Sequence, residues 1–438
     1  MLAIGLAYLA PATLAAQTLR IYHLDVDQAA ATLFVAPGGH TLLVDSGKNG
    51  HGGRIRSAMQ AAGVNRLDFF VATHYHEDHY GGIDEVVDAG VTVGAAFDRG
   101  DKSFLPASKR NDDDTYLDYQ RTVGGSAQQL RRGMTIPLDP SMTVTCLSSG
   151  GVVLGENDPP QPGDEENDMS VGLLITYGAF RYWIGGDTEV ATEAKLAARD
   201  LVQDVDVYQA HHHGADNGST DELLQDLRPA VIIISNGSHA TFKHPRRTTL
   251  ERMQGLIPPP VIYQINRFLG GGSVGANVDD SLIGDPEAGD DDGTILLTVD
   301  EAAGSYTVAY GNRTHAFGIR GSPGIDDDVT GRVVIARLLP DPVASPDRAG
   351  ERVMLANRGA IGVDLGEWFL RDAAGRVWSL SGVGTLAAAD SVNLRREGMA
   401  MSLDNEGDDI VLVDAAGEVV DSVSYLESQP GVEIVTGH

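Results

Sequence analysis

The residues most able to do chemistry are four potential metal ligands within six consecutive positions, HYHEDH at 74–79. Imidazole nitrogens and carboxylate oxygens are ligands that suit zinc. The spacing lets one tight turn serve two cations, with His74 and His76 holding one and Asp78 and His79 the other. The sequence therefore predicts a site for two divalent metal ions, with zinc as the first choice and manganese as the alternative.

Two later segments carry the same types of ligand. The chain has 13 histidines, and none of them lies between His79 and His211. The run HHH at 211–213 follows one strand-like segment, and Asp187 follows another at the start of a helix. A lone aspartate there would be an ordinary helix N-cap. In this order after the HYHEDH turn, we expect Asp187 to bridge the two cations.

The elements that must position these residues alternate between strand-like runs and short helices from Leu19 to about Val308. The HYHEDH turn directly follows the apolar run RLDFFVAT, and the HHH run follows DVDVYQA. The segments VGLLITYG and AFRYWIGG predict a hairpin with a glycine in its turn. This mixture indicates a layered α/β architecture in which strand ends hold the ligand-bearing loops.

The composition changes after a linker at 318–331. From 332 onward, short β segments recur at regular spacing, which predicts an all-β sandwich. We therefore expect a first domain at 17–317 and a second at 332–438. Residues 1–16 form an apolar run that is too short to span a bilayer and that ends in small residues. This run is typical of a secretory signal, although it lacks a basic start, and a buried N-terminal helix is the alternative.

The charge balance restricts the classes of partner. The chain has 32 Lys and Arg against 62 Asp and Glu, a formal net charge of −30. Coating of DNA or of anionic lipid depends on basic residues and is therefore not expected. The single cysteine, Cys146, excludes an intramolecular disulfide framework and a cysteine-rich zinc finger, and we expect it to be buried. No later stretch reaches transmembrane length, so the mature protein is expected to be secreted or periplasmic.

The segments THYHEDHYGG, GGDTE and HHG, in this order, resemble the metallo-β-lactamase superfamily. The resemblance implies an αββα sandwich with a binuclear metal site. More narrowly, ENDMSVGLLITYGAFRYWIGGD and SNGSHATFKHP are similar to the hydrolase domain of the ComEC/Rec2 competence proteins, and this similarity covers about 19–310. The family's early VGQGD turn is replaced here by VDQAA at 26–30, which puts the role of that turn in doubt.

The resemblance also implies a role for each matching residue. The first metal would be bound by His74 and His76, the second by Asp78 and His79, and Asp187 would bridge the two. A histidine of the HHG turn would complete the second site, with His212 as the choice and His213 as the alternative.

The remaining implied roles lie around these ligands. An Asn-containing turn at Asn167 stands where true β-lactamases carry a further histidine ligand, which leaves the first metal open to water or substrate. β-Lactam hydrolysis is therefore a poor expectation. Asp45 would support a ligand histidine by a hydrogen bond from outside the ligand set. His244 would donate a hydrogen bond or a proton to the leaving oxygen.

The C-terminal segments that contain Asn357, Trp368 and Tyr425 resemble the lamin tail domain. This resemblance implies an immunoglobulin-like sandwich that tethers the protein to a surface or polymer or presents substrate to it.

Together these features predict an exported hydrolase with two divalent metal ions. Its expected substrate is a phosphodiester, with extracellular DNA as the first choice. Asp78 and Asp187 would orient a metal-activated water, and His244 would assist the leaving group. One alternative is a hydrolase of small substrates, of the phosphorylcholine esterase or lactonase type. Another is a binding protein whose metal site is vestigial.

Overall fold

The computed structural model describes residues 18–100, 114–156, 165–238, 241–257, 259–287 and 293–320 of the first part of the chain. In the second part it describes 333–342, 350–357, 362–387, 390–396, 398–415, 417, 419–425, 428 and 430–435. The expected signal-like segment 1–16 and the linker residues 321–331 lie outside the described residues. In the described part of the chain, no helix is long and apolar enough to cross a membrane.

Two mixed β-sheets form the centre of the first domain. The first sheet has nine strands in the order β17-β16-β15-β1-β2-β3-β4-β5-β6. Its strands are β1 (Leu19–His23), β2 (Thr32–Val35), β3 (Thr41–Val44), β4 (Arg66–Val71), β5 (Thr92–Asp98), β6 (Gln128–Gln129), β15 (Ile295–Asp300), β16 (Ser305–Tyr310) and β17 (Arg313–Gly318).

The second sheet has eight strands in the order β14-β13-β12-β11-β10-β9-β7-β8. Its strands are β7 (Met142–Ser149), β8 (Val152–Val153), β9 (Gly172–Tyr177), β10 (Phe180–Ile184), β11 (Val207–Gln209), β12 (Val231–Ile234), β13 (Val261–Asn266) and β14 (Ile283–Asp285). Cys146 lies buried in β7, as predicted.

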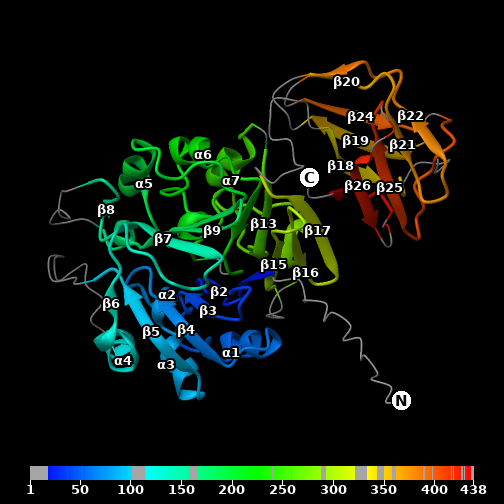
Figure 1. Ribbon diagram of the computed structural model, residues 1–438. Helices are drawn as coiled ribbons and strands as arrows, with labels where there is room; N and C mark the ends of the chain where they lie inside the picture. The colour runs from blue at the N-terminus through cyan, green and yellow to red at the C-terminus, as the bar shows by residue number, and fades with distance from the viewer. Residues whose placement is uncertain are drawn as a thin grey trace, which may run out of the picture.

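Helices cover the outer face of each sheet, as Figure 1 shows. The α-helices are α1 (Gly52–Ala61), α2 (Glu77–Tyr80), α3 (Ile83–Asp88), α4 (Asp114–Thr122), α5 (Val190–Ala197), α6 (Asp221–Leu227) and α7 (Arg247–Gln254). The short 3₁₀ turns are η2 (Gly124–Ser126), η3 (Asn167–Met169), η4 (His211–Gly214) and η5 (Asp280–Leu282). Helices α1, α3 and α4 lie on the first sheet, and α5, α6 and α7 lie on the second (Figure 1). The predicted αββα sandwich is confirmed.

The sequence explains the packing of these layers. Strands β2 and β3 read TLFV and TLLV and are buried at every residue because both of their faces are covered. The largest hydrophobic core joins β-branched and aromatic residues of the two facing sheets, and a second core joins the first sheet to its helices. The predicted β9–β10 hairpin is present, and its turn contains Gly178 at φ 56°, a left-handed conformation that glycine adopts without strain.

Parallel strand pairs determine where the functional loops meet. Strands β3, β4 and β5 run parallel in the first sheet, and β10, β11, β12 and β13 run parallel in the second. The carboxyl ends of parallel strands lie at the same edge of a sheet, where α/β proteins commonly bind ligands. The loops that follow β3, β4, β10, β11 and β12 carry all but one of the residues that were expected to form the site; the exception, Asn167, lies in η3 ahead of β9.

The regular elements with described bounds in the second domain are all β-strands. One four-stranded sheet has the order β24-β19-β18-β27, another has the order β22-β21-β25-β26, and β20 pairs with β23. The strands are β18 (Val333–Leu339), β19 (Arg352–Asn357), β20 (Val363–Asp364), β21 (Phe369–Arg371), β22 (Val377–Ser379), β23 (Thr385–Leu386), β24 (Ser391–Arg395), β25 (Asp408–Val413), β26 (Val419–Tyr425) and β27 (Ile434–Val435). All pairings are antiparallel, and Trp378 lies buried in the core, which fits the predicted immunoglobulin-like sandwich.

Candidate metal centre

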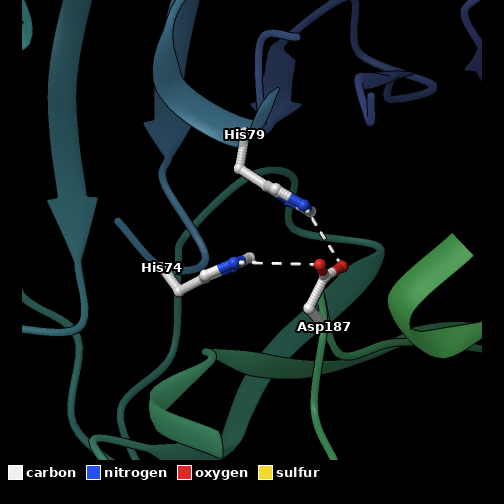
Figure 2. Close-up of side chains that lie close together, drawn as sticks. All are labelled: His74, His79 and Asp187. Atoms are coloured by element: carbon white, nitrogen blue, oxygen red, sulfur yellow. Dashed lines mark ion pairs between the residues drawn. The ribbon is translucent and has the colours of Figure 1, made fainter. Parts of the chain in front are cut away.

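The first group of potential ligands joins the two sheets. His74 and His79 lie after β4 of the first sheet, and Asp187 lies after β10 of the second. One ligand atom from each of these three residues lies within 4.8 Å of those of the other two. Figure 2 shows the carboxylate of Asp187 facing both imidazoles, with Oδ1 at 3.1 Å from Nε2 of His79 and Oδ2 at 3.9 Å from Nε2 of His74.

A second group shares His79 with the first. Asp78, His79 and His213 also place one ligand atom each within 4.8 Å of one another. Nε2 of His213 lies 3.4 Å from Oδ2 of Asp78 and 3.7 Å from Oδ2 of Asp187. The Asp187 carboxylate therefore lies within reach of both groups.

His76 lies beside His74, a member of the first group. Its Nδ1 atom lies 3.0 Å from Nε2 of His74. Two imidazole nitrogens at this distance need a proton or another cation between them, because their lone pairs would otherwise repel. The predicted pairing of His74 and His76 on one cation agrees with this geometry.

The donor set fits two divalent metal ions. Among the described residues, the buried Nε2 atoms of His79 and His213 have no hydrogen-bond partner, although buried polar atoms are normally paired. Both atoms face the carboxylates of Asp78 and Asp187. Nitrogen and oxygen ligands in this number suit zinc or a similar divalent cation.

Groups behind the ligands hold them in place. Nδ1 of His79 lies 2.7 Å from Oδ2 of Asp45, so it donates its proton to that carboxylate and turns its Nε2 lone pair toward the site. The backbone N–H and the hydroxyl of Thr73 also donate to Asp45. Asp45 thus lies behind His79, and partners of this kind fix the orientation of a ligand histidine.

The HHH turn places its three histidines in different surroundings. Nδ1 of His213 donates to the carbonyl oxygen of Ser235 at 2.7 Å, which leaves Nε2 free to bind a cation. His211 is fully buried, lies 2.6 Å from Glu193 through Nδ1, and accepts a hydrogen bond from the Trp183 indole at Nε2. Since both of its nitrogens are engaged inside the core, His211 is a structural residue.

The choice of His212 for the second metal does not fit this geometry. His212 and His213 both adopt left-handed backbone conformations, at φ 49° and φ 56°. This turn directs His213 toward Asp78, whereas His212 faces Asp187 and Glu189. The alternative, His213, is therefore the residue that joins the second group. Strain of this kind in non-glycine residues is concentrated at functional sites.

Burial and nearby charges shift the pKa values of the site residues in opposite directions. Burial alone would lower the pKa of His79, but the carboxylates of Asp187, Asp45 and Asp78 raise it well above its usual value. Burial would raise the pKa of Asp187, but His79 and the other nearby histidines hold it well below the usual range. The cluster therefore has a strong affinity for positive charge, whether a proton or a metal ion supplies it.

His244 lies next to this cluster. Its ring stacks on that of His213 with centroids 6.3 Å apart. Burial, followed by the charges of nearby basic groups, lowers the pKa of His244 to about 3, so the ring is neutral at physiological pH. Gln28 accepts the Gly237 N–H at Oε1, which leaves its Nε2 to donate to Nδ1 of His244 at 3.3 Å. His244 therefore carries its proton on Nε2.

Comparisons with known proteins agree with this geometry. Residues 24–237 match the metallo-beta-lactamase superfamily, and residues 327–427 match the lamin tail domain. The chain contains a metallo-β-lactamase domain followed by a lamin tail domain.

The chain is also distantly similar to two curated proteins. It is 27% identical over 242 residues to Recombination protein 2 of Haemophilus influenzae, which covers 54% of this chain and 26% of that protein. It is 24% identical over 196 residues to ComE operon protein 3 of Bacillus subtilis, which covers 45% of this chain and 23% of that protein. The chain thus spans about a quarter of the length of each relative.

Among solved structures, zinc-bound PqqB from Methylobacterium extorquens is similar to the chain. The two are 15% identical with a TM-score of 0.33, over 54% of this chain and 85% of that one.

Three contributors to the site were not foreseen. Glu189 contacts His212, Gln28 holds His244, and the carbonyl of Ser235 holds His213. For Glu189, the one signal in the sequence was its position two residues after Asp187. The other two contacts join segments that are far apart in the sequence. Asn167 lies beside His212 and Glu189.

Proposed function

We propose that the protein is an exported phosphodiesterase that uses two divalent metal ions and acts on DNA. The observation that supports this most directly is the pair of His/Asp groups that share His79 and adjoin Asp187. The similarity of the domain to Recombination protein 2 supports DNA as the substrate. We further propose zinc as the resident metal, with manganese as the alternative.

In the proposed reaction, the site residues bind the metal ions and orient the attacking water. The first metal would be held by His74, His76 and Asp187 and the second by Asp78, His79, His213 and Asp187. When bound, two such cations would lower the pKa of a water molecule and would stabilise negative charge on the attacked phosphate. Asp78 and Asp187 accept hydrogen bonds from that water and orient it toward the phosphorus.

His244 would act on the opposite side of the phosphate. Because its ring is neutral and its Nε2 carries the proton, it donates a hydrogen bond to the leaving oxygen rather than a full proton. The leaving oxygen takes its proton from solvent as the P–O bond breaks. This division assigns His244 to leaving-group stabilisation and the two aspartates to the nucleophile.

The net charge of −30 favours a second candidate, a hydrolase of small substrates of the phosphorylcholine esterase or lactonase type. A long polyanion would be repelled by the acidic surface away from the site. A small ester or lactone would not meet this barrier. For DNA hydrolysis, the acidic surface predicts that activity rises as salt screens the repulsion.

The two candidates and the vestigial alternative are separated by one experiment. Metal-loaded protein is assayed with single-stranded DNA, bis-p-nitrophenyl phosphate, p-nitrophenyl phosphorylcholine and an acyl lactone, beside the Asp78→Ala and Asp187→Ala variants. Hydrolysis of the first two substrates, abolished in both variants, supports a phosphodiesterase. Turnover of only the phosphorylcholine ester or the lactone supports the second candidate. Wild-type protein that binds metal and hydrolyses none of the four contradicts both.

The lamin tail domain is proposed to tether the enzyme to a surface or polymer. Export is proposed from the apolar segment 1–16 of the sequence. Detection of the protein in the culture medium or periplasm, with loss of export when 1–16 are deleted, would test this localisation.

A further inference from the structure

The HHH turn places both His212 and His213 near the same oxygen, Oδ2 of Asp187. Oδ2 of Asp187 lies 3.9 Å from Nε2 of His74, 3.7 Å from Nε2 of His213 and 3.8 Å from Nε2 of His212. His212 therefore stands at the same distance from this oxygen as a member of each ligand group.

Nδ1 of His212 also faces a carboxylate, but at ion-pair distance and, among the described residues, without the hydrogen bond that Nδ1 of His79 and of His213 makes. Its Nδ1 atom faces Oε1 of Glu189 at 3.4 Å, and its Nε2 atom lies 3.5 Å from Nδ2 of Asn167. An amide nitrogen can only donate, and a carboxylate can only accept. The Asn167 amide therefore faces an unprotonated Nε2, which leaves the proton of His212 on Nδ1, on the side of the Glu189 carboxylate.

Glu189 is itself fixed for this role. Its Oε1 atom accepts a hydrogen bond from Nδ2 of Asn167 at 2.8 Å and another from Nδ2 of Asn217 at 2.7 Å. A histidine with a carboxylate behind its proton-bearing nitrogen is the arrangement that surrounds protein metal ligands. Asp45 also stands behind His79, at the shorter distance of 2.7 Å, where it accepts a hydrogen bond.

The surroundings of His212 decide which metal it faces. Among the described residues, Asp78 forms ion pairs with His79 and His213 and none with His212. His212 lies instead against Asn167 and Glu189, and the Asp187 oxygen that it faces also faces both His74 and His213. The first metal, with His74, His76 and Asp187, also has fewer protein ligands than the second, with Asp78, His79, His213 and Asp187.

We propose that His212 is a ligand of the first metal, so that the HHH turn supplies one ligand to each ion. His212 would join His74, His76 and Asp187, while His213 remains with Asp78 and His79. The left-handed conformation of both residues serves this purpose, because it lets two adjacent side chains enter the same site. The assignment concerns metal binding alone and holds whichever substrate the enzyme hydrolyses.

The test is a measurement of metal content and affinity. Metal-free protein is titrated with Zn²⁺ against a chromophoric chelator, and the zinc retained after dialysis is counted by atomic emission. Asparagine tolerates left-handed backbone, so His212→Asn removes the ligand atom without adding backbone strain. The exposed His40, replaced in His40→Asn, controls for the loss of a histidine.

The expected result is two zinc ions per chain for the wild type and His40→Asn, and one for His212→Asn. Glu189→Gln should lower the affinity for the first zinc ion by about 10-fold or more, because it removes the carboxylate that faces Nδ1 of His212. Two ions bound by His212→Asn with unchanged affinities would overturn the assignment.

Double variants identify the ion that is lost. If His212 and His76 bind the same metal, His76→Asn combined with His212→Asn still retains one ion. His213→Asn combined with His212→Asn retains none, because each change then removes a different ion. The reverse pattern, with one ion retained by His212→Asn/His213→Asn, would place His212 on the second metal and contradict the proposal. Unfolding midpoints of the metal-free variants show whether any of them has lost its fold.

Discussion

Nε2 of His79 lies 3.1 Å from Oδ1 of Asp187, although the two residues come from opposite sheets of the sandwich. The site therefore depends on the packing of the two sheets against each other. Loss of an outer-shell partner alone usually weakens metal binding 10- to 100-fold. We expect Asp187→Asn, which removes a ligand near both groups, to exceed this range, at about 100-fold or more. Chelator competition with Zn²⁺ measures the affinity, and retention of two tightly bound ions would contradict the prediction.

Asp45 offers a test of the support behind His79. Asp45→Asn keeps the shape of the side chain but removes the negative acceptor at 2.7 Å from Nδ1 of His79. We expect zinc affinity to fall by about 10- to 100-fold while the fold is retained. Asp68→Asn is the matched control, because Asp68 accepts hydrogen bonds from Thr41 in the same sheet, away from the site. An equal loss of affinity in both variants would show a general effect of charge.

Gln28 and His244 are joined by a hydrogen bond that sets a tautomer. Gln28→Leu removes the donor to Nδ1 of His244 and allows its proton to move from Nε2. If the proposed phosphodiesterase reaction is correct, kcat for bis-p-nitrophenyl phosphate should fall by about 100-fold, the lower end of what a positioned proton donor contributes.

Zinc content should stay unchanged in Gln28→Leu, because neither Gln28 nor His244 is among the ligands. Gln28→Glu keeps a hydrogen-bonding group of the same length, but its carboxylate accepts where the amide donates, so activity should not recover. Full activity in Gln28→Leu would mean that the tautomer of His244 does not matter.

The fold and the ligand types could be predicted because both depend on local signals. The alternation of strands and helices, the HYHEDH turn and the position of Asp187 at a strand end are all visible in a few consecutive residues. The choice between His212 and His213 is not local in this sense. It depends on two successive left-handed residues and on the carbonyl of Ser235, which directly follows the next strand, β12.

Contacts between distant segments could also not be predicted, because no run of consecutive residues indicates them. Gln28 meets His244 across 216 positions, and Arg99 meets Glu166 across 67. Neither pair has a spacing that a helix or a strand would produce. Only the sandwich packing of the two sheets brings such residues together.

The Arg99–Glu166 pair is a buried ion pair beside the metal turn. Nε and Nη2 of Arg99 donate to the two carboxylate oxygens of Glu166 at 2.7 and 2.6 Å, and Oε1 also accepts the N–H of Tyr75 at 2.7 Å. Removal of one partner leaves an uncompensated buried charge, which costs about 3 to 5 kcal/mol. We therefore expect Arg99→Met to lower the free energy of unfolding by about that amount in urea denaturation.

A double-mutant cycle checks whether the loss of stability comes from the unpaired buried charge. Arg99→Met combined with Glu166→Gln should cost less than the sum of the two single changes, because no charge is then left unpaired. The exposed pair of Arg121 and Asp118 is the control, and Arg121→Met should cost less than about 1 kcal/mol. Strict additivity at the buried pair would refute the explanation.

Because His23 is buried as a neutral ring, we expect the protein to lose stability in acid whether or not metal is bound. The ring is fully buried between the two sheets, and desolvation lowers its pKa from 6.5 to about 3. Its Nε2 lies 3.3 Å from the Tyr182 hydroxyl, which itself donates to Gln209, so the neutral imidazole donates to that hydroxyl. The unfolded chain binds a proton near pH 6.5, whereas the folded chain does not until about pH 3. The contribution of His23 is therefore fully present above pH 6.5 and is lost as the pH falls toward 3.

Between these limits, the free energy of unfolding should fall by about 1.4 kcal/mol per pH unit through this group. His23→Gln keeps a donor for the Tyr182 hydroxyl and does not titrate, so its stability should decline less steeply by that amount. Urea unfolding of both proteins at several pH values between 6.5 and 4, in the presence of a chelator, separates this effect from metal loss. Parallel pH profiles for the two proteins would show that His23 is already protonated in the fold, or that its charge is compensated there.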